Sequence, residues 1–93
     1  MPDLPNELRA RIGGKSWRVR FLRAREVGAR DGICIESPHV MKIRRTLSGR
    51  KLLETVVHEM LHAEHWQIDE EYVERTAADI ARLLWRLGYR RES

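Results

Sequence analysis

Cysteine is nearly absent from this chain of 93 residues. Because Cys34 is the only one, no disulfide can form within the chain, and we expect a reducing, cytoplasmic environment. No apolar run approaches the roughly 18 residues that a membrane-spanning helix needs, so we expect no membrane partner. The opening stretch MPDLPNELRARIGGK lacks the apolar core of a secretory signal, and we therefore predict no export by that route.

Internal repeats and low-complexity segments are also missing, and the chain is too short for two independent cores. Hydrophobic residues make up 42% and charged residues 34%, a balance typical of a small globular domain and not of a disordered segment. We predict a single domain over residues 1–93. Residues 1–14 are rich in proline and glycine and are expected to form a loose lead-in, with a short helical turn at Asn6–Ile12.

Positive charge is concentrated in the first half of the chain. Residues 1–50 hold 12 Lys or Arg and 5 Asp or Glu, a net charge of +7, whereas residues 51–93 hold 6 and 9, a net charge of −3. Trp17 and Phe21 alternate with arginines, so they are predicted to face the core and not a ligand. We therefore favour a solubilising strand face, and a nucleic-acid contact through the arginines is a less favoured alternative.

Three stretches in this half are predicted to form strands. In KSWRVRFL, Trp17, Val19 and Phe21 alternate with polar residues, which is the period of a half-buried strand. The stretch DGICIE predicts a second strand, in which Cys34 is a small buried residue and not a nucleophile. SPHVMKIRRTL predicts a third extended run, with Pro38 at its start or edge.

Beyond Ser48 the apolar period changes to three and four residues, which predicts helices. The first helix is expected to end near Trp66 and to be capped by Ser48 or Thr46. The second is expected over residues 70–88, with Asp69 as its N-cap. Its predicted apolar face consists of Val73, Ala77, Ile80, Leu84 and Leu87. The predicted fold class is α+β, with a small antiparallel or mixed sheet of about three strands followed by two packed antiparallel helices.

The first predicted helix contains the pattern H-E-x-x-H, formed by His58, Glu59, Met60, Leu61 and His62. Helix positions i and i+4 lie about 40° apart around the axis and about 6 Å apart along it. Two imidazoles in this relation can bind one zinc ion at about 2.0–2.1 Å. The intervening glutamate then lies beside the metal, where it can accept a proton from a bound water.

A catalytic zinc has three protein ligands and an open position for water, so a third ligand is needed. His65 shares the stripe of the other two histidines, but a straight helix places it about 10.5 Å along the axis from His58. It could bind the same ion only if the helix broke after His62. His65 therefore stays an alternative ligand.

Acidic residues of the second helix are better placed. If the two helices pack antiparallel, residues equally far from the turn face each other, and Glu74 is the acid closest to the height of the metal. We predict Glu74 as the third ligand, with Asp79, on the opposite flank, as an alternative. Glu70 and Glu71 lie closer to the turn and are assigned to pairing with the positive end of the helix.

The stretch LLETVVHEMLH, preceded by the strand-like VMKIRRTL, resembles the edge strand and active-site helix of the zincin metallopeptidases. The stretch ERTAADIARLL, from Glu74 to Leu84, is similar to the glutamate-bearing helix of gluzincins of the ImmA/IrrE type. The resemblance covers roughly residues 40–85 and implies a minimal zincin-like domain. It implies that His58, His62 and Glu74 bind one zinc ion per chain and that Glu59 is the general base.

These observations predict a zinc-dependent metallohydrolase, most simply a peptidase that uses a Glu-activated zinc-bound water on a peptide or protein substrate. The resemblance places the substrate strand along the sheet edge near Val40–Arg44. Candidate residues for stabilising the oxyanion are Tyr72, Tyr89 and His39, and none is favoured. The main alternative is a binding module in which zinc stabilises the fold without catalysis. Substrate, oligomeric state and any inhibitory role of the lead-in are not indicated by the sequence.

Overall fold

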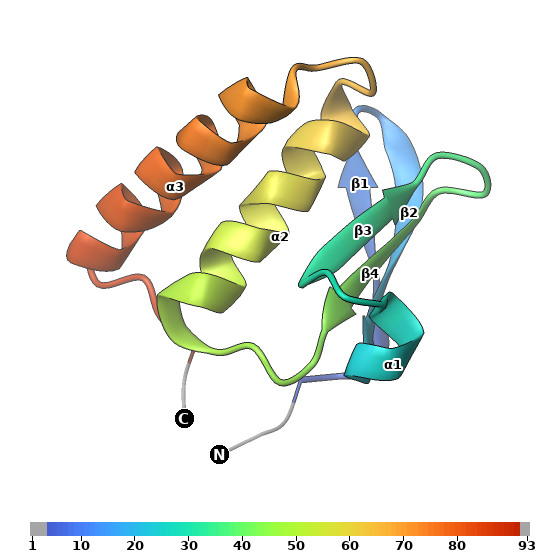
Figure 1. The fold of residues 1–93 in the computed structure, drawn as a ribbon, viewed down its shortest axis with the longest axis horizontal. Coiled ribbons are helices and arrows are strands. Elements are labelled where there is room, and N and C mark those ends of the chain that lie inside the picture. The colour runs from blue at the N-terminus through green and yellow to red at the C-terminus, as the bar shows by residue number, and fades with distance from the viewer. Residues whose placement is uncertain (1–3, 92–93) are drawn as a thin grey trace.

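The structure is a computed structural model that describes residues 4–91. Within these residues the chain forms four strands and three helices in the order β1 (Glu7–Ile12), β2 (Lys15–Leu22), α1 (Ala24–Val27), β3 (Gly32–Ile35), β4 (Val40–Arg44), α2 (Gly49–Glu64) and α3 (Glu70–Arg86). The two long helices, α2 and α3, lie to one side of the sheet (Figure 1). The predicted α+β class is therefore confirmed, with a mixed sheet followed by two packed helices.

The sheet has the strand order β1-β2-β4-β3, in which β2 and β4 are parallel and the other two pairs are antiparallel. Strand β4 is therefore central, and β3 lies at an edge. The segment that contains α1 carries the chain from β2 past β4 to that edge. The sequence predicts neither this short helix nor the position of β4 inside the sheet.

Strand β1 replaces the loose lead-in and helical turn that the sequence predicts at Asn6–Ile12. Residues 7–12 pair with β2 along their whole length. Gly13 and Gly14 connect the two strands with positive φ angles of 60° and 76°. A two-residue turn with two positive φ angles matches the twist of a hairpin, so the glycines form a β-turn and do not loosen the chain.

The core lies between the sheet and α2. Alternation in β2 is confirmed, because Trp17, Val19 and Phe21 are 1%, 5% and 6% exposed and their neighbours are not buried. Met41 and Ile43 of β4 face the same side, and Leu52 of α2 packs against this cluster. The arginines of the strands consequently point to the opposite face of the sheet.

Helix α3 packs against α2 through its small residues. Val73, Ala77 and Ala81 are fully buried, whereas Ile80 and Leu87, predicted to belong to the same face, are 36% and 65% exposed. The buried stripe follows residues four apart, and two alanines let the helix backbones approach closely. The start of α3 is the predicted one, because the Asp69 side chain accepts a hydrogen bond from the backbone N–H of Tyr72 at 3.1 Å.

Candidate metal centre

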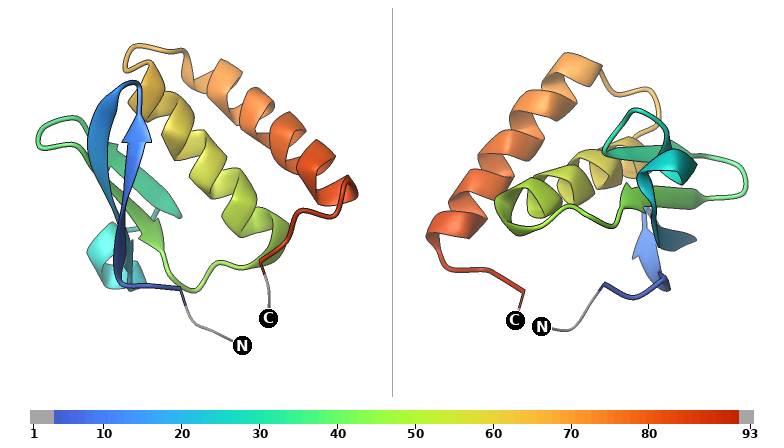
Figure 2. Two further views of the ribbon diagram at one scale, coloured as in Figure 1. Left: turned by 180° about the vertical axis from the view of Figure 1, so that it is seen from behind. Right: turned by 60° about the horizontal axis from the view of Figure 1, so that its bottom comes forward.

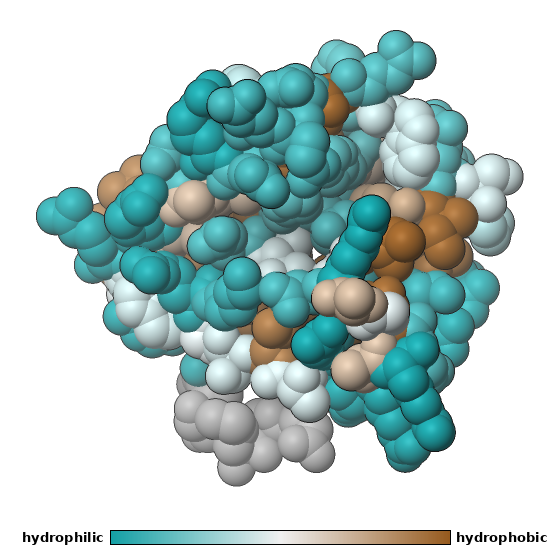
Figure 3. Space-filling view, in the orientation of Figure 1, coloured by the Kyte–Doolittle hydropathy of each residue, from teal (hydrophilic) through white to brown (hydrophobic). Residues whose placement is uncertain are grey.

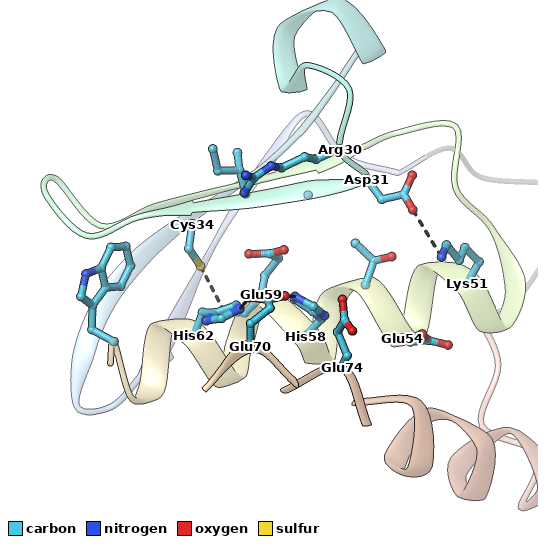
Figure 4. Close-up of a pocket in the computed structure, with 14 residues that line it drawn as sticks. Arg30, Asp31, Cys34, Lys51, Glu54, His58, Glu59, His62, Glu70 and Glu74 are labelled. Atoms are coloured by element: carbon cyan, nitrogen blue, oxygen red, sulfur yellow. Dashed lines mark hydrogen bonds and ion pairs between the residues drawn. The ribbon is translucent and has the colours of Figure 1, made fainter. Parts of the chain in front are cut away.

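A cleft of about 780 Å³ lies between β3, α2 and the first turns of α3. One face of α2 forms its floor, with side chains at helical spacing from Lys51 to His62, and β3 lies above it (Figure 4). The remaining wall comes from Glu70 and Glu74 of α3 and from Trp66. Hydrophilic side chains predominate on the face of the molecule shown in Figure 3.

Three of these side chains converge on one point. The Nε2 atoms of His58 and His62 lie 3.0 Å and 2.8 Å from the two carboxylate oxygens of Glu70. One ligand atom from each of the three residues lies within 4.8 Å of the others. The histidine side chains are only 23% and 19% exposed, and Glu70 covers them from the solvent side with a side chain that is 60% exposed.

The donor set fits a zinc ion. Two imidazole nitrogens and a carboxylate oxygen are common zinc ligands, and three protein ligands leave a fourth position open. Donors about 2.1 Å from a tetrahedral metal lie roughly 3.4 Å from one another. The observed separations between the histidine nitrogens and Glu70 are a few tenths of an ångström shorter than this. Small side-chain movements would therefore bring all three donors to ligand distance.

The acid that contacts His58 and His62 is Glu70 and not Glu74. The sequence assigns Glu70 only to the helix end, because it lies close to the turn. In the structure α2 ends at Glu64, the five residues 65–69 connect the helices, and the long Glu70 side chain reaches back over the histidines. Glu74 lines the same cleft one turn further along α3. Its role as a ligand stays a prediction, and Glu70 is the acid that the geometry favours.

Glu59 is the most enclosed acid of the cleft. Its residue is 7% exposed, and its carboxylate points into the space between α2 and β3 (Figure 4). Burial raises the pKa of this carboxyl, and the nearby imidazoles of His58 and His62 act in the opposite direction. A carboxyl in this environment exchanges protons closer to neutral pH than a solvated one does.

Because Gly32 has no side chain, it leaves space for the side chain of Glu59. A Cβ atom at Gly32 would lie 3.1 Å from Cγ of Glu59 and 3.1 Å from Cγ2 of Thr55. Since β3 passes so close to α2 at this point, a side chain on the strand would displace the glutamate. The absence of a side chain at Gly32 therefore helps to position the candidate general base.

Cys34 lies on the same strand, two residues further along. Its Sγ donates a hydrogen bond to the backbone oxygen of Glu59 at 3.0 Å. Burial, followed by the negative charge of Glu59, raises the pKa of the thiol to about 12. The side chain is thus a protonated thiol at neutral pH, which agrees with the predicted structural role.

The other predicted candidates lie outside the cleft. His65 is the exposed C-cap of α2, and Asp79 forms an ion pair with Arg82 at 2.9 Å. Among the candidates for the oxyanion, His39 stacks on Trp17, Tyr72 is 45% exposed below the guanidinium of Arg75, and Tyr89 lines a second cavity. None of them lines the cleft among the described residues.

Several residues of the cleft are not predicted from the sequence. Lys51, Glu54, Thr55 and Trp66 share the cleft face of α2 and its C-terminal connection with the two histidines, at spacings of three and four. This polar stripe is visible in the sequence once the histidines are taken as its centre. Arg30 and Asp31 could not be found in this way, because the α1–β3 connection brings them to the cleft.

Among the described residues, no helix is long and apolar enough to cross a membrane. The chain was compared with protein-family models, with curated proteins and with solved structures, and none of the three comparisons finds a match.

Proposed function

We propose that the protein is a zinc-dependent hydrolase that cleaves peptide bonds, with His58, His62 and Glu70 as metal ligands and Glu59 as the general base. The observation that carries the proposal is the convergence of two imidazole nitrogens on one carboxylate beside a buried glutamate, in an open cleft. A structural zinc site would have four protein ligands and no need of the cleft.

Bound zinc supplies a Lewis acid that lowers the pKa of a coordinated water to about 7. The chain provides the groups around it. The carboxylate of Glu59 takes a proton from water in the cleft and delivers it to the amine that leaves when the peptide bond breaks. Its burial between α2 and β3 removes competing solvent, and Gly32 keeps its position free.

A substrate strand is best accommodated along β3. The sequence expects the edge near Val40–Arg44, but β4 is paired on both sides, with β2 and β3. Strand β3 pairs only with β4 among the described residues, and it lies directly above the floor of the cleft. A peptide added to the free edge of β3 would form main-chain hydrogen bonds and pass over the histidines.

A second function is a binding module in which zinc only stabilises the fold. It is favoured by the way α3 packs chiefly against α2, because a metal shared by His58, His62 and Glu70 would fasten α3 in place. Such a site contributes folding free energy without catalysis. Glu59, which lies outside the three-ligand group, would have no role in it.

The change Glu59→Gln separates the two functions. We expect zinc binding to be unchanged and hydrolysis of a peptide library, read by mass spectrometry, to fall at least about a hundredfold, as general-base catalysis contributes about that much. Glu54→Gln is the matched control, since Glu54 lines the same cleft from the same helix. If wild-type protein loaded with zinc cleaves no peptide, the proposed hydrolase activity is excluded. If Glu59→Gln keeps full activity, another residue is the general base.

A further inference from the structure

The sheet has a second face that neither α2 nor α3 covers. Both long helices lie to one side of the sheet in the two views of Figure 2. Residues paired across neighbouring strands point to the same face, so the register determines which side chains share the open face. Arg9 pairs with Arg18, and Arg20 pairs with both Glu7 and Lys42.

This register brings six cations together on the open face. They come from three adjacent strands: Arg9 and Arg11 on β1, Arg18 and Arg20 on β2, and Lys42 and Arg44 on β4. Glu7 is the only acid among the paired residues of these strands on that face. The backbone positions that carry neighbouring cations lie about 6.7 Å apart along a strand and about 4.8 Å apart across strands. The group forms a dense positive surface, which we call the basic face. Arg44 lies at its end, where its guanidinium is held by the backbone oxygens of Gly28 and Arg30 and by Asp31.

Much of this charge is available to a ligand. Glu7 contacts Arg18 and Arg20 at 3.1 Å and 3.4 Å, and the arginine side chains are still 43% and 40% exposed. Arg9 and Arg11 are exposed, and Lys42 forms no ion pair with any of residues 4–91. A surface that served only for solubility would mix charges of both signs. Here the five cations other than Arg44 face one acid, Glu7, which leaves a net excess of four positive charges.

We propose that the basic face binds the phosphate backbone of duplex DNA. A duplex carries one negative charge per roughly 1.7 Å of its axis, and the basic face presents several cations from three adjacent strands to such phosphates. The aromatic side chains of the strands, Trp17 and Phe21, are buried on the other side of the sheet. Single-stranded binders depend on exposed aromatic side chains for base stacking, so the basic face favours backbone contacts without base readout.

The proposal is independent of the metal centre, because β2 and β4 separate the basic face from the cleft. It would hold the protein on DNA with the cleft turned away from the duplex.

The test is a fluorescence anisotropy titration of the zinc-loaded protein with a labelled duplex of about 20 base pairs, at several salt concentrations. Each phosphate contact contributes about 0.9 to the slope of log K against log salt. The double variant Arg9→Gln/Lys42→Gln should therefore reduce the slope by up to about 1.8 and weaken binding by about tenfold or more at low salt. Lys42→Gln alone should give about half the change in slope.

The matched control is Arg75→Gln/Arg86→Gln, which removes the same charge from exposed positions on α3. It should leave the salt slope unchanged. The proposal is overturned if the wild-type protein does not bind the duplex at low salt, or if both double variants lose affinity equally. It is also overturned if the single strand binds more tightly than the duplex, or if poly-glutamate competes as well as DNA does.

Discussion

At the scale of single residues, the candidate site contains a glutamate, Glu59, in a buried position where an ionised carboxylate is unfavourable for folding. Glu59 is 7% exposed, and its burial raises its pKa above the usual 4.5. A carboxyl whose pKa is higher in the folded than in the unfolded state destabilises the fold when it ionises. The destabilisation is absent at pH values below the pKa of the unfolded state, and it is complete at pH values above the pKa of the folded state.

We therefore expect Glu59→Gln to stabilise the metal-free protein near neutral pH. Thermal unfolding in the presence of a chelator should give a higher Tm for the variant at about pH 7.5, and the difference should shrink towards about pH 4 as the wild-type carboxyl becomes protonated. Glu54→Gln serves as the control for loss of one charge from the same face of α2. A lower Tm for Glu59→Gln at neutral pH would show that the carboxylate has a stabilising partner.

Gly32 gives a second prediction at this scale. Gly32→Ala would place a methyl group 3.1 Å from Glu59 and Thr55 and 3.2 Å from Ile43, and overpacking of this kind costs about 1–3 kcal/mol. We expect urea unfolding to show this loss and peptidase activity to fall because Glu59 moves, while zinc content is retained. Full activity with an unchanged unfolding midpoint would mean that β3 shifts freely and that Gly32 does not position the glutamate.

At the scale of elements, the sequence predicts those whose apolar period is regular. Strand β2 has uninterrupted alternation, and α2 and α3 have clear stripes and a cap at Asp69, so all three were found. Strand β1 is not predicted, because the prolines before it and the glycines after it are typical of a loop, although the two glycines form the hairpin turn. The position of β4 inside the sheet depends on pairing between distant segments, which a local pattern cannot show.

The choice between Glu70 and Glu74 as the third ligand depends on the same kind of non-local geometry. His58, Glu59 and His62 are fixed relative to one another by one helix, so their spacing alone predicts that they share a site. The height of the partner on α3 depends on the length and path of residues 65–69 and on the reach of a flexible side chain. The spacing of the helices predicts that an acid of α3 faces the histidines, and it does not determine whether that acid lies in the first or the second turn.

The cap of α3 lies next to the candidate metal centre, since Asp69 directly precedes Glu70. Asp69→Ala removes the bond to the Tyr72 N–H and should cost about 1 kcal/mol, or roughly 4–8 °C in Tm for a domain of this size. Zinc affinity, measured by competition with a chromophoric chelator, should fall as well, because the first turn of α3 frays. Asp69→Ser, which can still cap the helix, should keep most of the thermal stability and most of the zinc affinity. Equal losses of stability and affinity in the two variants would rule out the cap as the cause.

At the scale of the whole molecule, the sheet separates two surfaces of different chemistry. One face packs on α2 and forms the roof of a polar cleft with a candidate metal centre, and the other carries the basic face. A small domain buries little apolar surface, so a metal that joins α2 to α3 would also stabilise it. Under the proposed function, catalysis and stability would both depend on the same three ligands.

The most direct test is the zinc content of the protein purified without a histidine tag, measured by elemental mass spectrometry for the wild type, Glu70→Gln and Glu74→Gln. We predict about one zinc per chain for the wild type and for Glu74→Gln, and a large loss for Glu70→Gln, because among residues 4–91 only Glu70 has a carboxylate in contact with both histidines. Retention by Glu70→Gln together with loss by Glu74→Gln would move the third ligand to Glu74. A wild-type protein that neither contains zinc nor takes it up would contradict the metal centre itself.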